Sequence, residues 1–269
     1  MNNWPFERKA VIGMVHVGAL PGTPKSRMSV SALAADAARE AAAIESAGLD
    51  AVMIENMHDC PYVHGEALGP EITSAMTKIG QAVRDAISLP LGVQILSGGN
   101  RHALAVALAI DAQFIRCENF VFSHIADEGL LAEAEAGPLL RYRRNIGADH
   151  IAIYCDIKKK HASHAITADL DLAQCVNAAE FFGADGIIVT GSATGLPTSI
   201  DDVSAARSAT TLPILVGSGT TPNNVLDMLA HADAVIVGSS IKHEGIWSNP
   251  VDPRRCEQLV RSARTPRGG

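Results

Sequence analysis

Eight short apolar runs, each followed by a segment with helical spacing, are the feature that most restricts the fold of this chain. The runs are rich in Val and Ile and are continuous, as are strands buried on both faces of a parallel sheet. They span Ala10–Val17, Ala51–Asn56, Leu91–Leu96, Gln113–Asn119, Ile151–Ile157, Gly186–Thr190, Ile214–Gly217 and Ala234–Gly238. The pattern predicts eight consecutive βα units.

The segments between these runs carry helix start and stop signals. The expected helices are Ser31–Ala47, Pro70–Ile87, Arg101–Ile110, Gly137–Asn145, Asp169–Phe182, Ser199–Ala209, Pro222–Ala230 and Asp252–Ala263. A serine at the start of the first helix and Gly48 after it are typical caps. Thr221 and Pro222 predict the start of the seventh helix, because proline is favoured in the first turn.

Eight βα units in 269 residues predict an α/β fold, a single-domain (β/α)8 TIM barrel over residues 1–269. Such barrels take about 250 residues, and no linker or change in composition divides this chain. A doubly wound open sheet is the alternative, since the number of strands does not prove closure. The last five residues, 265–269, are expected to fray.

Composition excludes several classes of protein. A net charge of −7 argues against a general nucleic-acid binder, although it allows a local cationic pocket. No run reaches the roughly 18 apolar residues of a membrane span. Five scattered cysteines without a C-x-x-C pair indicate reduced thiols and a cytoplasmic location. We also expect a homo-oligomer, because small barrels often bury helix surface against a copy of themselves.

Polar and ionisable residues gather where the expected strands end, which is where barrel enzymes place their chemistry. The candidates from the first five strands and the loops after them are His16, Glu55, Asn56, Gln94, Arg116, Glu118, Asn119, Asp156 and Lys158. The last three strands add Thr190 and Lys242 to this set. Such groups are costly at a barrel mouth unless they pair or bind something, so we expect a site there.

Among these candidates, Glu55 and Asp156 end strands on opposite arcs of the barrel. They could act as general acid and base, hold a divalent metal ion, or be structural carboxylates paired with Arg116 or Lys158. Lys158, two residues beyond Asp156, is expected to point into the mouth, where it could form a Schiff base. The two lysines after it are expected to be solvated.

Other roles stay open from the residues alone. His16 and Glu118 join the expected reactive end, although a strand histidine can equally be a hydrogen-bonded core residue. The loop with residues 127–129, Asp-Glu-Gly, is either a lid or an ordered surface loop.

Glycine-rich loops follow the last three strands and predict a phosphate site. Residues 217–219 read Gly-Ser-Gly and residues 238–240 read Gly-Ser-Ser, after the seventh and eighth strands. Many barrel enzymes bind phosphate with these two loops. The expected cradle is Gly191, Ser192, Gly217, Ser218, Gly219, Gly238, Ser239 and Ser240. Plain turn chemistry is the alternative for each loop.

Several phrases together resemble the BtpA/SgcQ family. They are VIGMVHVGALPGTP (11–24), DAVMIENMHDCPY (50–62), QFIRCENF (113–120), EAGPLLRYRRNIGAD (135–149), DIKKKHA (156–162), IIVTGSATG (187–195), PILVGSGTTPNNV (213–225), AVIVGSSIKHEG (234–245) and PVD (250–252). The resemblance implies a ribulose-phosphate-binding type of barrel. It also implies either photosystem I biogenesis or, for the SgcQ branch, an enzyme encoded with sugar-uptake genes. Members often have Pro-Pro where residues 17–22 read VGALPG.

We therefore expect an enzyme acting on a small phosphorylated metabolite, such as a sugar phosphate, by isomerisation, aldol-type cleavage or hydrolysis. The phosphate would lie on the last three loops and the reactive end over the earlier strands. A divalent metal ion is the one cofactor left open. The alternative is a non-catalytic factor in photosystem I biogenesis.

Overall fold

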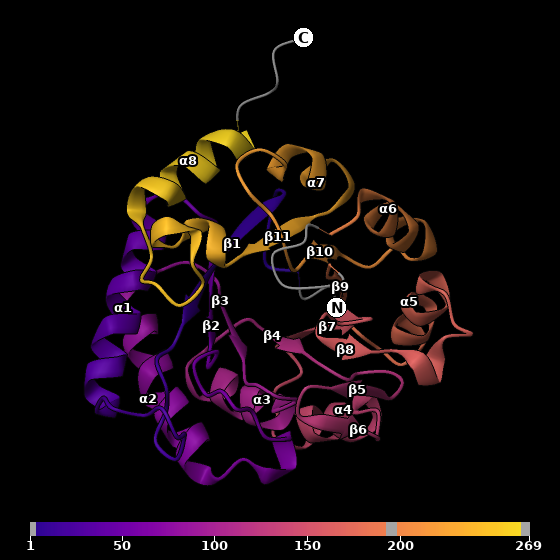
Figure 1. Cartoon of the computed structure of the whole chain (residues 1–269), viewed down its shortest axis with the longest axis horizontal. Coiled ribbons are helices and arrows are strands. Elements are labelled where there is room, and N and C mark those ends of the chain that lie inside the picture. Colours follow the sequence, from indigo (N-terminus) through magenta and orange to yellow (C-terminus); the bar gives the residue numbers. More distant parts are fainter. Residues whose placement is uncertain (1–3, 192–197, 265–269) are drawn as a thin grey trace.

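Eight parallel strands close into a barrel in the computed structural model, which describes residues 4–191 and 198–264 (Figure 1). In chain order the barrel strands are β1 (Ala10–His16), β2 (Ala51–Glu55), β3 (Leu91–Gln94), β4 (Phe114–Cys117), β7 (Ala152–Ile157), β9 (Gly186–Val189), β10 (Ile214–Val216) and β11 (Ala234–Val237). Closure is direct, since β1 pairs with both β2 and β11. The predicted barrel is confirmed, and the open sheet is excluded.

Eight helices surround the barrel (Figure 1). They are α1 (Val30–Ser46), α2 (Pro70–Ala86), α3 (Asn100–Ala109), α4 (Ala136–Asn145), α5 (Leu172–Phe181), α6 (Ile200–Ala209), α7 (Val225–His231) and α8 (Pro253–Arg264) within the described ranges. Helix α1 is capped by Ser29, not by Ser31. Helix α5 starts at Leu172, where Asp171 and Gln174 form a capping box, three residues later than expected.

The predicted start of the seventh helix is wrong. Helix α7 begins at Val225 and has Asn224 at its N-cap, so Thr221 and Pro222 lie outside it. The Asn224 side chain accepts a hydrogen bond from the Thr221 amide at 2.7 Å and donates one to the Gly219 carbonyl at 3.0 Å. These bonds fold residues 221–224 into a turn before the helix.

Side chains alternate along each barrel strand between the barrel interior and the helices, because successive residues point to opposite faces. The interior set includes Met14, Met53, Phe114, Tyr154 and Ile236. Gly92 leaves space for the Phe114 side chain, since a Cβ at position 92 would lie 2.1 Å from the Phe114 ring. His16, Glu55, Gln94, Arg116 and Asp156 share this phase and therefore form the next layer, at the C-terminal ends of the strands.

Trp4 and Phe6 pack against the interior set at the opposite end. The Trp4 ring lies 5.7 Å from the Tyr154 ring, and the Phe6 ring lies 6.4 Å from the Phe114 ring. Side chains thus close the barrel at the N-terminal ends of its strands, and the barrel is open at their C-terminal ends.

A small antiparallel sheet, not expected from the sequence, stands beside the barrel mouth. Its strands are β5 (His124–Ala126), β6 (Gly129–Leu131) and β8 (Ala162–Ser163). Strands β5 and β6 form a hairpin whose turn is residues 127–128, and β8 follows the loop after β7. The loop left open between a lid and a surface loop is therefore a hairpin at the mouth.

Three further expectations concern a membrane span, the cysteines and the C-terminal tail. Across residues 4–191 and 198–264, no helix is both long and apolar enough to cross a membrane. All five cysteines are free, and all but Cys60 are buried. The tail 265–269, expected to fray, lies outside the described residues.

Candidate functional site

A cavity of about 550 Å³ opens at the C-terminal end of the barrel. The structure brings twelve of the nineteen candidates into its wall, six on each side. Residues from the earlier strands line one side: His16, Glu55, Gln94, Arg116, Glu118 and Asp156. The two glycine loops line the other: Gly217, Ser218, Gly219, Gly238, Ser239 and Ser240. Their catalytic and binding roles stay predictions.

The other candidates lie elsewhere. Asn56 is fully buried and holds the loops after β2 and β3 together, since its amide contacts Asp59 at 2.8 Å and the Leu96 backbone at 2.7 Å. Asn119 donates to the Glu133 carbonyl at 2.6 Å and thereby anchors the chain that leaves the β5–β6 hairpin. Both lie outside the cavity wall, where their side chains contact neighbouring loops.

Three more candidates lie outside the cavity wall, and a fourth lies outside the described residues. Lys242 is fully buried and its Nζ pairs with Glu40 of α1 at 2.8 Å, because the short turn after β11 directs it to the helix layer. The Thr190 hydroxyl oxygen accepts a hydrogen bond from the Lys160 backbone amide at 3.1 Å, which supports the loop after β7. Gly191 is buried but does not line the cavity, and Ser192 lies outside the described residues.

The expectation for the three lysines after β7 is wrong, because the roles are reversed. Lys158 has a φ of 47° and its Nζ donates to the Leu170 carbonyl, away from the main cavity. Lys159 and Lys160 line the cavity instead. The alternation of side chains holds only while a strand continues, and β7 ends at Ile157. The left-handed turn at Lys158 redirects the residues that follow.

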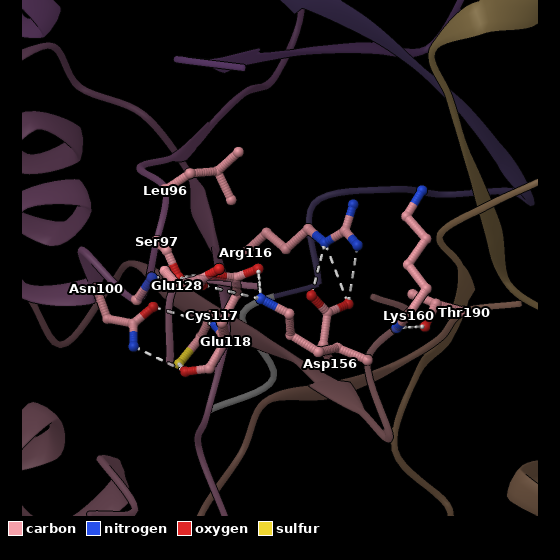
Figure 2. A network of polar contacts seen from close by, with 12 residues as sticks. Leu96, Ser97, Asn100, Arg116, Cys117, Glu118, Glu128, Asp156, Lys160 and Thr190 are labelled. Carbon is pink, nitrogen blue, oxygen red and sulfur yellow. Dashed lines mark hydrogen bonds and ion pairs between the residues drawn. The ribbon is translucent and has the colours of Figure 1, made fainter. Parts of the chain in front are cut away.

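Arg116 and Asp156 form a buried ion pair on the floor of the cavity (Figure 2). The Arg116 Nε lies 3.1 Å from each carboxylate oxygen, and Nη2 lies 3.1 Å from Oδ1. Burial raises the pKa of Asp156, and the attraction of Arg116 offsets only part of that effect. Asp156 therefore fits the structural alternative stated for it, while one edge of the pair still faces the cavity.

Lys159 joins the hairpin to the barrel. Its Nζ lies 2.8 Å from Glu118 Oε1 and 3.8 Å from Glu128 Oε1. Ser97, which is labelled with Glu128 in Figure 2, donates a hydrogen bond to Glu128. Burial disfavours the charged form of Glu118, but Lys159 and the Gly98 amide overcome burial and lower its pKa. Glu118 is therefore ionised at neutral pH, and the hairpin turn is held over the mouth.

His16 and Glu55 face each other on neighbouring strands. His16 Nδ1 lies 2.8 Å from the Trp247 carbonyl oxygen, which can only accept, so Nδ1 carries the proton and Nε2 does not. His16 Nε2 lies 3.6 Å from Glu55 Oε2. Burial, with the nearby charge of Lys242, lowers the pKa of His16 to about 3. The ring is therefore neutral at pH 7.

Burial raises the pKa of Glu55 to about 6, against the opposing attraction of Arg116 and Lys160. Among the described residues, no lysine or arginine lies within ion-pair distance of this carboxylate. Glu55 can thus take up or release a proton near neutral pH, which is the property of a general acid or base.

Two cations stand at the glycine loops without a carboxylate partner among the described residues. Lys160 Nζ lies 3.4 Å from Ser218 Oγ, in the loop after β10. Arg255, near the start of α8, donates from Nε to the Ser240 carbonyl at 2.9 Å, in the loop after β11. Both line the cavity. Burial lowers the pKa of Lys160, and the repulsion of Arg116 adds to that effect. An anion at these loops would compensate both charges.

The sequence analysis missed several residues of the wall. An apolar part is formed by Met57, Tyr62, Leu96 and Trp247, and the Trp247 ring lies 4.9 Å from the His58 ring. The run of three lysines marked Lys159 and Lys160 in the sequence, but it predicts solvated side chains and not cavity residues. No sequence pattern indicates Arg255, because it belongs to helix α8 and does not follow a strand directly in the sequence.

The carboxylates do not form a ready metal site. Within the described part of the chain, no three residues of the types His, Cys, Asp and Glu are grouped so that they could hold a metal ion. Two of the carboxylates already have a cation, since Asp156 pairs with Arg116 and Glu118 pairs with Lys159.

Comparison with known proteins supports one family. A model of the BtpA family matches residues 7–265. An uncharacterised mitochondrial protein of Caenorhabditis elegans is 42% identical over 263 residues, which cover 96% of this chain and 94% of that protein. The photosystem I biogenesis protein BtpA of Synechocystis sp. is 34% identical over 251 residues, which cover 93% of this chain and 86% of that protein.

Solved structures of phosphate-ligand enzymes share the fold. (S)-3-O-geranylgeranylglyceryl phosphate synthase of Thermoplasma acidophilum, in complex with sn-glycerol-1-phosphate, superposes with a TM-score of 0.59 at 16% identity, over 96% of this chain and 94% of that one. N-(5'-phosphoribosyl)anthranilate isomerase of Pyrococcus furiosus gives a TM-score of 0.56 at 12% identity, over 95% and 98%. At such low identity these likenesses show the barrel fold alone.

Proposed function

The chain belongs to the BtpA family, and from that premise and the charges at its barrel mouth we propose that it is an enzyme acting on a small phosphorylated metabolite, such as a sugar phosphate. The phosphate would bind at the loops after β10 and β11. The reactive end would lie over β1, β2, β4 and β7.

The observation that carries this proposal is the pair of cations without carboxylate partners, Lys160 and Arg255. Both residues are partly buried, and a charge withdrawn from water is costly unless something compensates it, so a phosphate between the two loops would stabilise them. The Thermoplasma synthase named above was solved with its substrate sn-glycerol-1-phosphate, so an enzyme with this fold binds a small phosphorylated substrate.

The reactive end supports a reaction in which a proton moves. Glu55 would remove or return the proton, because its pKa of about 6 places both of its states within reach at neutral pH. Arg116 and Lys159 would stabilise negative charge that develops on a substrate oxygen. Isomerisation and aldol-type cleavage both use such a proton transfer, and hydrolysis is the third reaction compatible with the site.

Calorimetric titration of inorganic phosphate tests the proposal. Removing either cation by Lys160→Met or Arg255→Met should weaken binding by about tenfold or more, since a hydrogen bond to a charged group contributes about 1.5–3 kcal/mol. Lys158→Met is the matched control, because it removes the same charge from a neighbouring residue outside the main cavity. Equal affinity in all variants, or no binding by the parent, would show that the phosphate site is misplaced.

The second candidate is a non-catalytic factor in photosystem I biogenesis, supported by the name of the Synechocystis relative. Such a role requires a surface for another protein, and adjacent Phe181 and Phe182 at the end of α5 are 84% and 52% exposed. A Phe181→Ser variant that binds phosphate like the parent but fails in photosystem assembly would favour this candidate. Free thiols suit either function in a reducing compartment such as the cytoplasm.

A further inference from the structure

Two buried polar atoms in the cavity wall have no hydrogen-bond partner among the described residues. They are Gln94 Oε1 and Thr220 Oγ1. Gln94 is 2% exposed and Thr220 is 3% exposed. Nearly all buried polar atoms in folded proteins are hydrogen-bonded, so an orphan acceptor in a cavity wall indicates a position where a ligand supplies the missing partner.

These two atoms lie on opposite sides of the mouth. Around the barrel the order of strands is β1, β11, β10, β9, β7, β4, β3 and β2, so β3 and β10 are four strands apart in a ring of eight. Gln94 ends β3, and Thr220 lies in the loop after β10. Thr220 therefore belongs to the phosphate end of the cavity, and Gln94 marks the end remote from it.

The surroundings of Gln94 define what it can bind. Glu55 is its cross-strand neighbour on β2, and on its other side Arg116 lies on β4 and Glu118 directly after that strand. Arg116 is paired with Asp156 and Glu118 with Lys159, which leaves the amide of Gln94 without either partner. An amide oxygen accepts a hydrogen bond and its nitrogen donates, so a hydroxyl group, which does both, matches this side chain.

We propose that Gln94 binds a hydroxyl group of the substrate at the end remote from the phosphate. This inference rests on the proposed function and narrows it: the substrate is a hydroxylated phosphate ester, and Gln94 selects it against an alkyl phosphate of the same length. Glu55 stands next to Gln94, so the selected hydroxyl lies where the proton is transferred.

Pairs of phosphate esters matched in length test the inference. Glycerol 3-phosphate is compared with propyl phosphate, and ribitol 5-phosphate with pentyl phosphate, by calorimetry. A site that hydrogen-bonds a hydroxyl rejects the analogue without it, so the parent should prefer the hydroxylated ester of at least one pair by about tenfold or more. Gln94→Met, which keeps the volume but not the hydrogen bond, should reduce that preference to about threefold or less. Inorganic phosphate should bind parent and variant alike.

Each other outcome has a definite meaning. Equal binding within every pair by the parent, or a preference that persists in Gln94→Met, overturns the role of Gln94 while phosphate binding still stands. Tighter binding of 3-aminopropyl phosphate than of either hydroxylated ester would show that the donor is an ammonium group, and would overturn the hydroxyl. If inorganic phosphate and all esters fail to bind, the phosphate site itself is wrong, and this inference falls with it.

Discussion

The pH dependence of stability at Glu55 gives a test that needs no substrate. The change is Glu55→Gln, which keeps the shape of the side chain and removes its charge. Glu55 is 7% exposed, and its nearest basic group among the described residues is the neutral His16, at 3.6 Å. The ionised carboxylate is thus buried without an ion-pair partner, while glutamine resembles the protonated form.

The magnitude follows from the pKa. Burial raises it from 4.5 in the unfolded chain to about 6 in the folded protein. Each unit corresponds to 1.36 kcal/mol, so the rise from 4.5 to about 6 amounts to about 2 kcal/mol. The folded state binds this proton more tightly, so the stabilisation is complete below pH 4.5 and is lost as pH rises through about 6. Above pH 7 the parent no longer has this stabilisation, whereas the stability of the glutamine variant does not change with pH at this position.

Urea denaturation followed by circular dichroism measures the effect. The free energy of unfolding of Glu55→Gln, relative to the parent, should be higher at pH 8 than at pH 4.5 by about 2 kcal/mol. Glu257→Gln, on the exposed face of α8, is the control and should show no such difference. A relative stability that is the same at both pH values, or lower at pH 8, would mean that ionised Glu55 is a structural ion-pair member. Once a substrate is known, turnover should fall by about 10².

Three further predictions concern the barrel and its assembly. Asp156→Asn leaves Arg116 buried without its counter-charge and should lower the free energy of unfolding by about 3–5 kcal/mol, measured in urea; a loss under about 1 kcal/mol would contradict the ion-pair reading. Gly92→Ala places a Cβ 2.1 Å from the Phe114 ring and should destabilise by about 1–3 kcal/mol, seen as a lower melting temperature, whereas an unchanged melting temperature would refute the packing argument. The expected homo-oligomer should appear in light scattering, and a monomer mass at every concentration would exclude it.

The barrel and the inner layer of its mouth could be predicted because both depend on local periodicity. Continuous apolar runs mark buried parallel strands, and alternation then fixes which strand-end residues face inward. His16, Glu55, Gln94, Arg116 and Asp156 all share the phase of the interior set. Residues one position out of that phase, such as Asn56, face the loops and helices instead.

The parts that could not be predicted depend on contacts between distant segments. A run of three lysines has no phase of its own, and only the positive φ at Lys158 decides which of them enter the cavity. The strands β5, β6 and β8 have two or three residues each, too few to show alternation, and β8 pairs with β5 across 36 positions of the chain, Ala126 with Ala162. Arg255 reaches the mouth from a helix, where no strand-end rule applies.

The division of charge across the mouth explains why the two halves of the cavity suit different tasks. On the side of β4 and β7, each cation has its own carboxylate: Arg116 has Asp156, and Lys159 has Glu118. These ion pairs hold the hairpin in place, and they leave no excess positive charge on this side, because Lys159 also faces Glu128. On the side of β10 and β11, Lys160 and Arg255 have no carboxylate within ion-pair distance among the described residues, which leaves an excess of positive charge at the glycine loops.

An anion placed at these loops would be attracted by the two uncompensated cations, and the carboxylates opposite would repel it from the other side. In the proposed function, the same repulsion would align an elongated phosphate ester across the mouth, with its uncharged end near the carboxylate of Glu55, whose pKa is about 6.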